Sequence, residues 1–262
     1  LNHLLLPWLG LTSASAALML AFVAISALAV ASHLRAMLTD PGTVPRAYQP
    51  AHLLSEEEAL PMCSRCNGFK PPRAHHCSQC DRCIMKMDHH CPWVNNCVGA
   101  NNQAHLWLFV GCTAILASFA IVLLVARFFA TVTDPATLGA GGGAHRHARG
   151  GGRGAAAHHG RAARDDQSGL RQRGDHADES LELLQLCLLF FESLILGLFT
   201  CAMLFEQIAS ILSDQTGIER LKQDHMPRAG GSTLALLSEA FGRPFSLLWF
   251  LPTPVRFHGL TS

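Results

Sequence analysis

Cysteine and histidine residues are concentrated in one polar segment of the chain, between residues 39 and 104. This segment holds seven of the ten cysteines: Cys63, Cys66, Cys77, Cys80, Cys83, Cys91 and Cys97. Five of them form Cys-x2-Cys pairs, as Cys63-x2-Cys66 and Cys77-x2-Cys80-x2-Cys83, a spacing that sets two thiolates about one tetrahedral edge apart and favours zinc. An odd number of cysteines argues against complete disulfide pairing. The segment therefore predicts a zinc-binding domain.

A ligand count leaves one cysteine free for chemistry. A structural zinc ion takes four ligands, so two Cys3His sites would use six cysteines and two histidines. Cys91 is the best candidate for the remaining cysteine, because Asp88 and His89 precede it closely. A thiolate nucleophile needs a neighbouring base or cation, and the base needs an orienting carboxylate. The alternative, that Cys91 is a zinc ligand or an inert thiol, stays open at this point.

The segment from Lys70 to Gln103, KPPRAHHCSQCDRCIMKMDHHCPWVNNCVGANNQ, resembles the cysteine-rich domain of the DHHC protein S-acyltransferases, or palmitoyltransferases. The resemblance extends to Asp40-Pro41-Gly42 and to the tail motifs SDQTGIERLKQ and FGRPFSLLWF, which look like the Golgi-type branch of the family. It covers roughly Ser13 to Pro252, apart from a Gly/His-rich loop.

The resemblance implies two interleaved structural zinc ions and a catalytic set between them. The first ion would be held by Cys63, Cys66, His76 and Cys83, and the second by Cys77, Cys80, His90 and Cys97. Cys91 would be the nucleophile, His89 the general base and Asp88 the carboxylate that orients it. This assignment agrees with the ligand count.

The reaction that the family implies is a ping-pong transfer of a long-chain acyl group. Palmitoyl-CoA would acylate Cys91, and the acyl group would then pass to cysteines of membrane-associated substrate proteins. Lys70 and Arg73 are candidate contacts for the CoA phosphates. Phe109, Thr113 and Leu116 are candidate lining residues of an acyl tunnel, with packing between helices as the alternative.

Three apolar stretches are long enough to cross a bilayer, which takes roughly 20 residues. They run over residues 13–38, 105–132 and 183–212. Charged residues make up only 15% of the chain, against ~25% in soluble domains. The predicted fold is therefore an α-helical integral membrane protein with a small zinc-ordered domain. The family usually has four spans, so we expect the fourth to precede Leu1 in an N-terminally incomplete chain.

Between the spans, the sequence predicts segments on alternate sides of the membrane. Reduced thiols and basic residues close behind the third span favour the cytosol for the cysteine-rich domain, 39–104, and for the tail, 213–262. Residues 1–12 and a Gly/His/Arg-rich loop, 133–182, would then be luminal, and the composition of the loop predicts disorder. The expected location is the Golgi membrane, with the endoplasmic reticulum as the alternative, and membrane lipids are expected partners.

One tail motif departs from the family pattern, and three other functions are alternatives to acyl transfer. The family's tail motif Thr-Thr-x-Glu reads Thr216-Gly217-Ile218-Glu219, so Asp88 is expected to need a partner other than the second threonine. An inactive zinc-ordered scaffold would bind substrates without becoming acylated. A zinc transporter is disfavoured, because transport would need several polar ligands inside the membrane spans. Nucleic-acid binding is disfavoured by the spans and by a net charge of +1.

Overall fold

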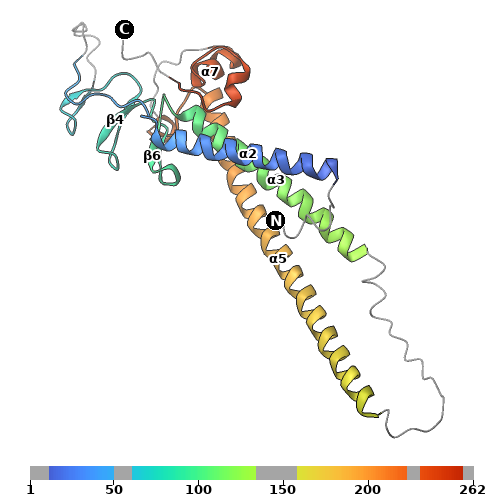
Figure 1. Ribbon diagram of the computed structural model, residues 1–262. Coiled ribbons are helices and arrows are strands. Elements are labelled where there is room, and N and C mark those ends of the chain that lie inside the picture. The colour runs from blue at the N-terminus through green and yellow to red at the C-terminus, as the bar shows by residue number, and fades with distance from the viewer. Residues whose placement is uncertain (1–11, 50–60, 134–157, 223–230, 256–262) are drawn as a thin grey trace. The chain divides into compact units, whose positions relative to one another are not determined.

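The computed structural model describes residues 12–49, 61–133, 158–222 and 231–255, which form helices and three short hairpins (Figure 1). The chain divides into two compact units. We call residues 1–19 and 117–196 the helical unit, and residues 20–116 and 197–262 the cysteine-rich unit.

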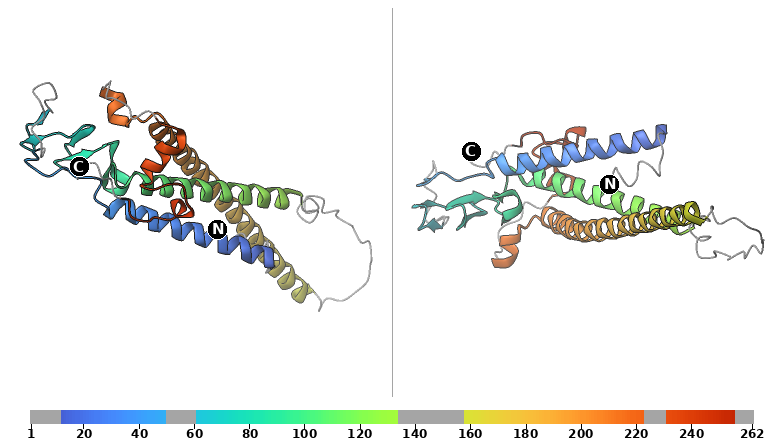
Figure 2. Two further views of the ribbon diagram at one scale, coloured as in Figure 1. Left: turned by 90° about the horizontal axis from the view of Figure 1, so that it is seen from above. Right: turned by 60° about the horizontal axis from the view of Figure 1, so that its bottom comes forward.

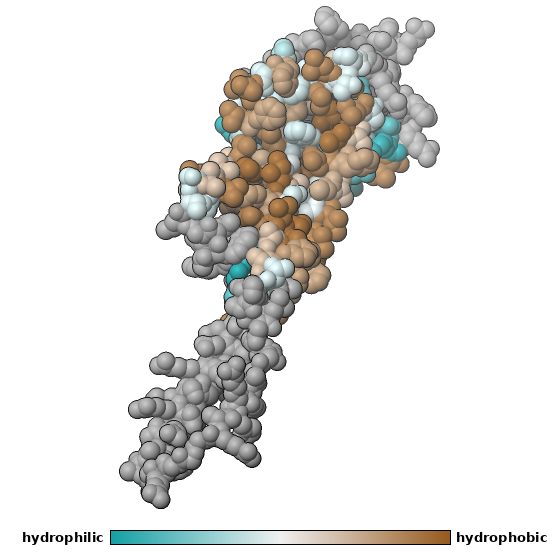
Figure 3. All heavy atoms as spheres, turned by 90° about the vertical axis from the view of Figure 1, so that its right-hand side faces the viewer, coloured by the Kyte–Doolittle hydropathy of each residue, from teal (hydrophilic) through white to brown (hydrophobic). Residues whose placement is uncertain are grey.

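In the part of the chain that the structure describes, three helices are long and apolar enough to cross a membrane, over Ser13–Leu38, Gln103–Thr131 and Ser180–Leu212. They belong to α2 (Ser13–Leu38), α3 (Gln103–Thr133) and α5 (His158–Leu212). Apolar side chains gather on the face drawn in Figure 3, as expected for surfaces that contact lipid. The predicted fold class, a helical membrane protein with three visible spans, is confirmed.

Helix α5 begins well before the predicted span. We expected disorder over 133–182, but the chain is helical from His158 onward, while residues 134–157 lie outside the described residues. The prediction was therefore wrong for 158–182. Residues with high helix propensity (arginine, alanine, glutamine, leucine and glutamate) make up 13 of the 25 residues of this stretch. Continuation of an existing helix also avoids the cost of nucleating a new one.

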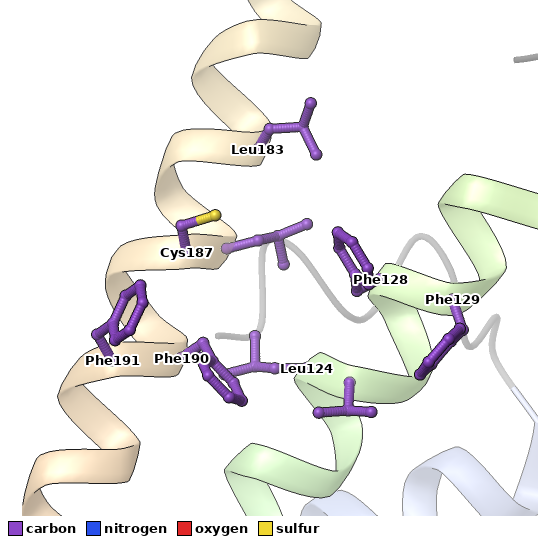
Figure 4. A pocket seen from close by; sticks show the side chains of 9 residues that line it. Leu124, Phe128, Phe129, Leu183, Cys187, Phe190 and Phe191 are labelled. Atoms are coloured by element: carbon purple, nitrogen blue, oxygen red, sulfur yellow. The ribbon is translucent and has the colours of Figure 1, made fainter.

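Within the helical unit, α3 and α5 line an apolar cavity of about 380 Å³. Phe128, Phe129 and Leu124 of α3 lie opposite side chains of α5 that include Cys187 and Phe190 (Figure 4). An ion pair of 2.7 Å between Arg127 and Glu182 also joins the two helices. This pairing offsets part of the cost of an arginine near the end of a span.

The cysteine-rich unit contains three two-stranded antiparallel hairpins at the C-terminal end of α2 (Figure 1). They pair β1 (Met62–Cys63) with β2 (Gly68–Phe69), β3 (Ala74–Cys77) with β4 (Arg82–Met85), and β5 (His89–Cys91) with β6 (Asn96–Val98). A 3-10 turn, η2 (Pro92–Val94), connects the last two strands. Strands this short bury too little surface to be stable alone, so they need cross-links.

The Asp40-Pro41-Gly42 segment attaches these hairpins to the end of α2. Asp40 Oδ1 accepts hydrogen bonds from the backbone N–H groups of Gly42 and Thr43, at 2.8 and 2.7 Å. Gly42 O then accepts from the N–H of Met85 in β4, at 2.8 Å. The turn after the first span is therefore part of the hairpin domain.

The tail forms α6 (Gly217–Lys222), α7 (Thr233–Ala240) and a 3-10 turn, η4 (Leu247–Phe250). Phe241 stacks on Trp249 at 4.6 Å between ring centroids, and both pack with Ala104 and Trp107 of α3. The left view of Figure 2 shows α7 beside α3, in agreement with this packing. The tail is thus packed against the base of the second span.

Candidate functional site

Among the described residues, two clusters, each of three cysteines and one histidine, could hold metal ions. They bring together Cys63, Cys66, His76 and Cys83 in one cluster, and Cys77, Cys80, His90 and Cys97 in the other, which are the two sets predicted from the sequence. In each cluster the histidine presents Nδ1 to the sulfur atoms. These S···N distances are 3.4–3.9 Å in the first cluster and 3.4–3.7 Å in the second.

These distances fit a tetrahedral metal site. A Zn–S bond of about 2.3 Å gives a tetrahedral S···S edge of about 3.8 Å. The Sγ atoms of Cys66 and Cys83 are 3.7 Å apart, and those of Cys80 and Cys97 are 3.5 Å apart. Asp81 Oδ1 lies 3.7 Å from the other ring nitrogen of His76, where a carboxylate would orient a ligating histidine.

The alternation of side chains along β3 explains why the two sites interleave. Successive residues of a strand point to opposite faces. His76 faces the first cluster together with its cross-strand partner Cys83, and Cys77 faces the second cluster. One strand thus contributes a ligand to each site.

The turns of Cys63-x2-Cys66 and Cys77-x2-Cys80 require an unusual backbone conformation. The residue after each pair, Asn67 or Asp81, has a left-handed conformation with φ of 50° or 49°. Asparagine and aspartate adopt this conformation more readily than other residues with side chains. The chain therefore carries residues suited to the sharp turns around the two clusters.

The same alternation separates the neighbouring histidines of β5. His90 is paired across the hairpin with Cys97, and both face the second cluster. His89 and Cys91 project from the other face of the strand. His89 Nδ1 lies 2.9 Å from Asp88 Oδ2, and the Cys91 side chain interacts with the same ring. Asp88, His89 and Cys91 are thus brought together outside both clusters.

Asp88 is buried and accepts hydrogen bonds from three further groups. Gln207 Nε2 donates to Oδ2 at 2.9 Å. The backbone N–H of Gly217 and the hydroxyl of Ser210 donate to Oδ1 at 2.6 and 3.2 Å. The tail motif lacks the family's second threonine, so we expected Asp88 to have another partner. Gln207 and Ser210 are such partners.

These contacts favour charged forms in all three residues of the set. Burial raises the pKa of Asp88, but hydrogen bonds led by those of His89 and Gly217 outweigh it and lower the pKa to about 2. Burial lowers the pKa of His89, whereas Asp88 and Cys91 together raise it to about 9. Burial raises the pKa of Cys91, but His89 and two backbone N–H groups bring it below its usual value.

A histidine whose protonated form is favoured, beside a cysteine whose pKa is lowered, is the kind of environment that activates a cysteine nucleophile. Among the described residues, Nε2 of His89 has no partner that meets ordinary hydrogen-bond geometry. Its interaction with Cys91 is therefore looser than the contact of Nδ1 with Asp88.

Apolar side chains surround Cys91, which is only 2% exposed. It belongs to a cluster with Val94, Leu106 and Val110, against which Phe109, Met203 and Leu204 pack. Phe109 therefore packs against the cluster that contains the nucleophile, and its assignment as a tunnel residue stays a prediction. Thr113 donates its hydroxyl to the Phe109 carbonyl at 2.8 Å, and Leu116 is half-buried further along α3.

Arg73 has a different environment from the one we predicted for a phosphate contact. Its guanidinium donates to both carboxylate oxygens of Glu219, at 2.8 and 3.0 Å, and to Asp214 Oδ1 at 2.6 Å. Its side chain is only 14% exposed. All three nitrogen atoms are engaged, so we withdraw the prediction for Arg73. Lys70 is half-buried, and its assignment stays a prediction.

Two asparagines connect the site to the C-terminal end of the first span. The Asn96 amide donates to the carbonyls of Ala36, Met37 and Thr39 at 2.9–3.2 Å. Asn102 donates to the Ala36 carbonyl at 3.1 Å. Carbonyls at a helix C-terminus lack intrahelical partners. Because Asn96 is the cross-strand partner of Cys91, these bonds connect the nucleophile's hairpin to the first span.

Comparison with known proteins identifies the family. The family model described as DHHC palmitoyltransferase matches residues 56–224. Human "Palmitoyltransferase ZDHHC3" is 34% identical over 230 residues, which cover 86% of this chain and 65% of the relative. Mouse "Palmitoyltransferase ZDHHC7" is 36% identical over 238 residues, which cover 88% of this chain and 65% of the relative.

A protein of Arabidopsis thaliana is also similar to this chain, over a shorter region. "Probable protein S-acyltransferase 16" of Arabidopsis thaliana is 39% identical over 131 residues, or 45% of each chain. The present chain thus spans about 65% of the length of the first curated relatives that it matches. The matched region contains both Cys/His clusters and Asp88, His89 and Cys91. The chain belongs to the DHHC palmitoyltransferase family.

Proposed function

We propose that this chain is a protein S-acyltransferase that forms a thioester intermediate at Cys91 and passes the acyl group to cysteines of substrate proteins. The observation that carries the proposal is the position of Cys91, which lies beside His89 and within an apolar cluster. His89 would activate the sulfur of Cys91, and the apolar cluster would accommodate the hydrocarbon chain of the acyl group. The names of the relatives, palmitoyltransferases, support palmitoyl-CoA as the donor.

In the first half-reaction, the Cys91 thiolate attacks the carbonyl carbon of the acyl-CoA thioester. A bond forms between Cys91 Sγ and the acyl carbon, and the bond from that carbon to the CoA sulfur breaks. The CoA thiolate leaves and takes a proton from His89 Nε2. His89 can serve in this way because its Nδ1 is fixed by Asp88.

In the second half-reaction, a cysteine thiol of the substrate protein gives its proton to His89 Nε2. Its sulfur attacks the acyl carbon and displaces Cys91 as a thiolate. The starting pair of thiolate and imidazolium is restored, so one proton and one acyl group are transferred in each cycle.

We further propose that each Cys/His cluster holds one Zn²⁺ ion, with the ligand sets given above. Each ion would have four protein ligands and no open position, so zinc would supply structural cross-links between the hairpins. Bound in this way, the second ion would hold His90 and thereby fix the neighbouring residues of β5.

The proposed membrane arrangement places the cysteine-rich domain and tail in the cytosol, and residues 1–12 and the loop after α3 in the lumen of the Golgi. The acyl chain would extend from Cys91 along α3, past Phe109, Thr113 and Leu116. Phe109 carries most of the structural support, because it packs against the Cys91 cluster. Lys70 remains the proposed contact for a CoA phosphate, and surrounding lipids would cover the apolar helices.

The experiment that tests this function measures autoacylation of the purified chain in lipid nanodiscs with radiolabelled palmitoyl-CoA. We expect incorporation that hydroxylamine removes at neutral pH, as for a thioester, and no incorporation in the Cys91→Ser variant. Both proteins should contain two zinc ions by native mass spectrometry, since Cys91 lies outside both clusters. Equal labelling of the variant, or loss of zinc from it, would contradict the assigned role of Cys91.

A further inference from the structure

The last turns of the third apolar span carry two buried polar side chains on one face. Gln207 is 2% exposed and Ser210 is 4% exposed, and they are one helical turn apart in α5. Buried polar groups are costly unless they are hydrogen-bonded. Both side chains donate to the carboxylate of Asp88, which lies more than a hundred positions earlier in the chain.

The donors occupy the two carboxylate oxygens in a complementary way. Oδ2 accepts from Gln207 Nε2 and from His89 Nδ1, both at 2.9 Å. Oδ1 accepts from Ser210 and from the N–H of Gly217. An ionised carboxylate only accepts hydrogen bonds, so the Gln207 amide must present its NH₂ group to it. With two donors on each oxygen, the carboxylate is prevented from rotating.

We propose that Gln207 and Ser210 are positioning residues for the acyl-transfer reaction. By holding Asp88 in one orientation, they direct Oδ2 at His89 Nδ1 and keep Nε2 of the same ring available to Cys91. This inference rests on the proposed function, and it adds the residues of the membrane helix on which that function depends.

The backbone geometry explains why side chains of α5 take this part. Gly217 begins α6 and already brings its N–H to 2.6 Å from Asp88 Oδ1. A Cβ atom at this position would lie 3.2 Å from the Asp88 carbonyl oxygen and 3.3 Å from Oδ1, which is a tight approach. The close contact leaves little space for a side chain at 217, so the remaining donors come from α5.

The alternative is that Gln207 and Ser210 only anchor α5 to the hairpins. Anchoring and positioning differ in what a substitution changes. Loss of an anchor lowers stability and zinc retention. Loss of a positioning contact lowers the rate constant of acyl transfer while acyl-CoA binding and zinc content are retained.

The test is single-turnover acylation of the full chain in nanodiscs with palmitoyl-CoA, measured for Gln207→Leu, Ser210→Ala and Ser210→Thr. We expect the rate constant to fall about tenfold or more in Gln207→Leu and Ser210→Ala, since hydrogen bonds to charged groups are the stronger kind. Half-saturation by palmitoyl-CoA and two zinc ions per chain should be unchanged. Ser210→Thr keeps the hydroxyl and should retain most of the rate.

Two controls sharpen this result. Glu206→Gln changes the neighbouring exposed residue, whose side chain pairs with Arg220 rather than Asp88, and should acylate at the wild-type rate. In an Asp88→Ala background, Gln207→Leu should cost nothing further, because the group through which it acts is already gone.

Several outcomes would overturn the inference. If Gln207→Leu and Ser210→Ala both acylate at the wild-type rate, the two residues are not positioning residues. The proposed function would still stand in that case, provided that Cys91→Ser is inactive. Loss of zinc together with activity would make the two residues anchors. If Gln207→Leu slows acylation equally with and without the Asp88 carboxylate, Gln207 does not act through Asp88. If the wild-type chain itself forms no thioester, the proposed function fails and the inference fails with it.

Discussion

Replacing Arg73 by methionine should destabilise the cysteine-rich unit without weakening acyl-CoA binding. The side chains of Arg73, Asp214 and Glu219 are 14%, 10% and 3% exposed, so water cannot take over the lost contacts. Removal of one member of a buried ion pair costs about 3–5 kcal/mol, because the remaining charges are left uncompensated. Here two carboxylates lose one shared partner, so the upper part of this range is expected.

The assay is thermal unfolding of the chain in detergent, together with the concentration of palmitoyl-CoA that half-saturates autoacylation. Arg73→Met should unfold at a clearly lower temperature, with half-saturation unchanged in the folded fraction. Arg46→Met is the matched control: Arg46 also pairs with an aspartate, but the two side chains are 65% and 62% exposed. Exposed pairs contribute little to stability. A variant of Arg73 with normal stability and weak acyl-CoA binding would restore the phosphate contact and refute our reasoning.

Three further predictions concern the hairpins. His90→Ala should lose one of two zinc ions by native mass spectrometry, whereas His89→Ala should keep both and slow autoacylation by ~10²–10⁴-fold; the same zinc count and the same rate defect in both would refute the division of roles. Cys66→Ser and Cys97→Ser should each release metal and unfold the hairpins in a zinc-release assay, since structural zinc contributes about 10 kcal/mol or more; full zinc content would count against the ligand sets. Asn96→Ala should lower stability by about 1–3 kcal/mol in denaturant titrations while keeping zinc, because three hydrogen bonds to the end of α2 are lost; unchanged stability would mean that this connection is unimportant.

The local features of the site were accessible from the sequence because they depend on short spacings. Cys-x2-Cys pairs place their thiolates together through one turn, and Asp88, His89 and Cys91 are close in the chain. The spans were equally accessible, since length and apolar composition alone decide whether a helix can cross a bilayer. The start of α5 could not be predicted from the sequence, because a polar stretch can be helical when it extends an existing helix.

The contacts that depend on tertiary structure could not be predicted from local spacing. Arg73 and Glu219 are far apart in the sequence, and an isolated arginine before a cysteine motif gives no indication of an acidic partner in the tail. Gln207 and Ser210 did leave a signal, namely two polar residues one helical turn apart in a largely apolar helical end. That signal predicts a buried hydrogen-bonding partner, but only the fold identifies it as Asp88.

The register of β5 links the metal clusters to the chemistry. Because strand side chains alternate, His90 can face the second cluster only if His89 and Cys91 face the opposite side. A shift of one residue would exchange these faces, turning His89 toward the metal ligands and His90 toward Asp88. The pairing of His90 with Cys97 opposes this shift, since both are members of one cluster. A metal ion bound there would therefore act on catalysis from a distance, by keeping His89 on the side of the strand where Asp88 and Cys91 lie.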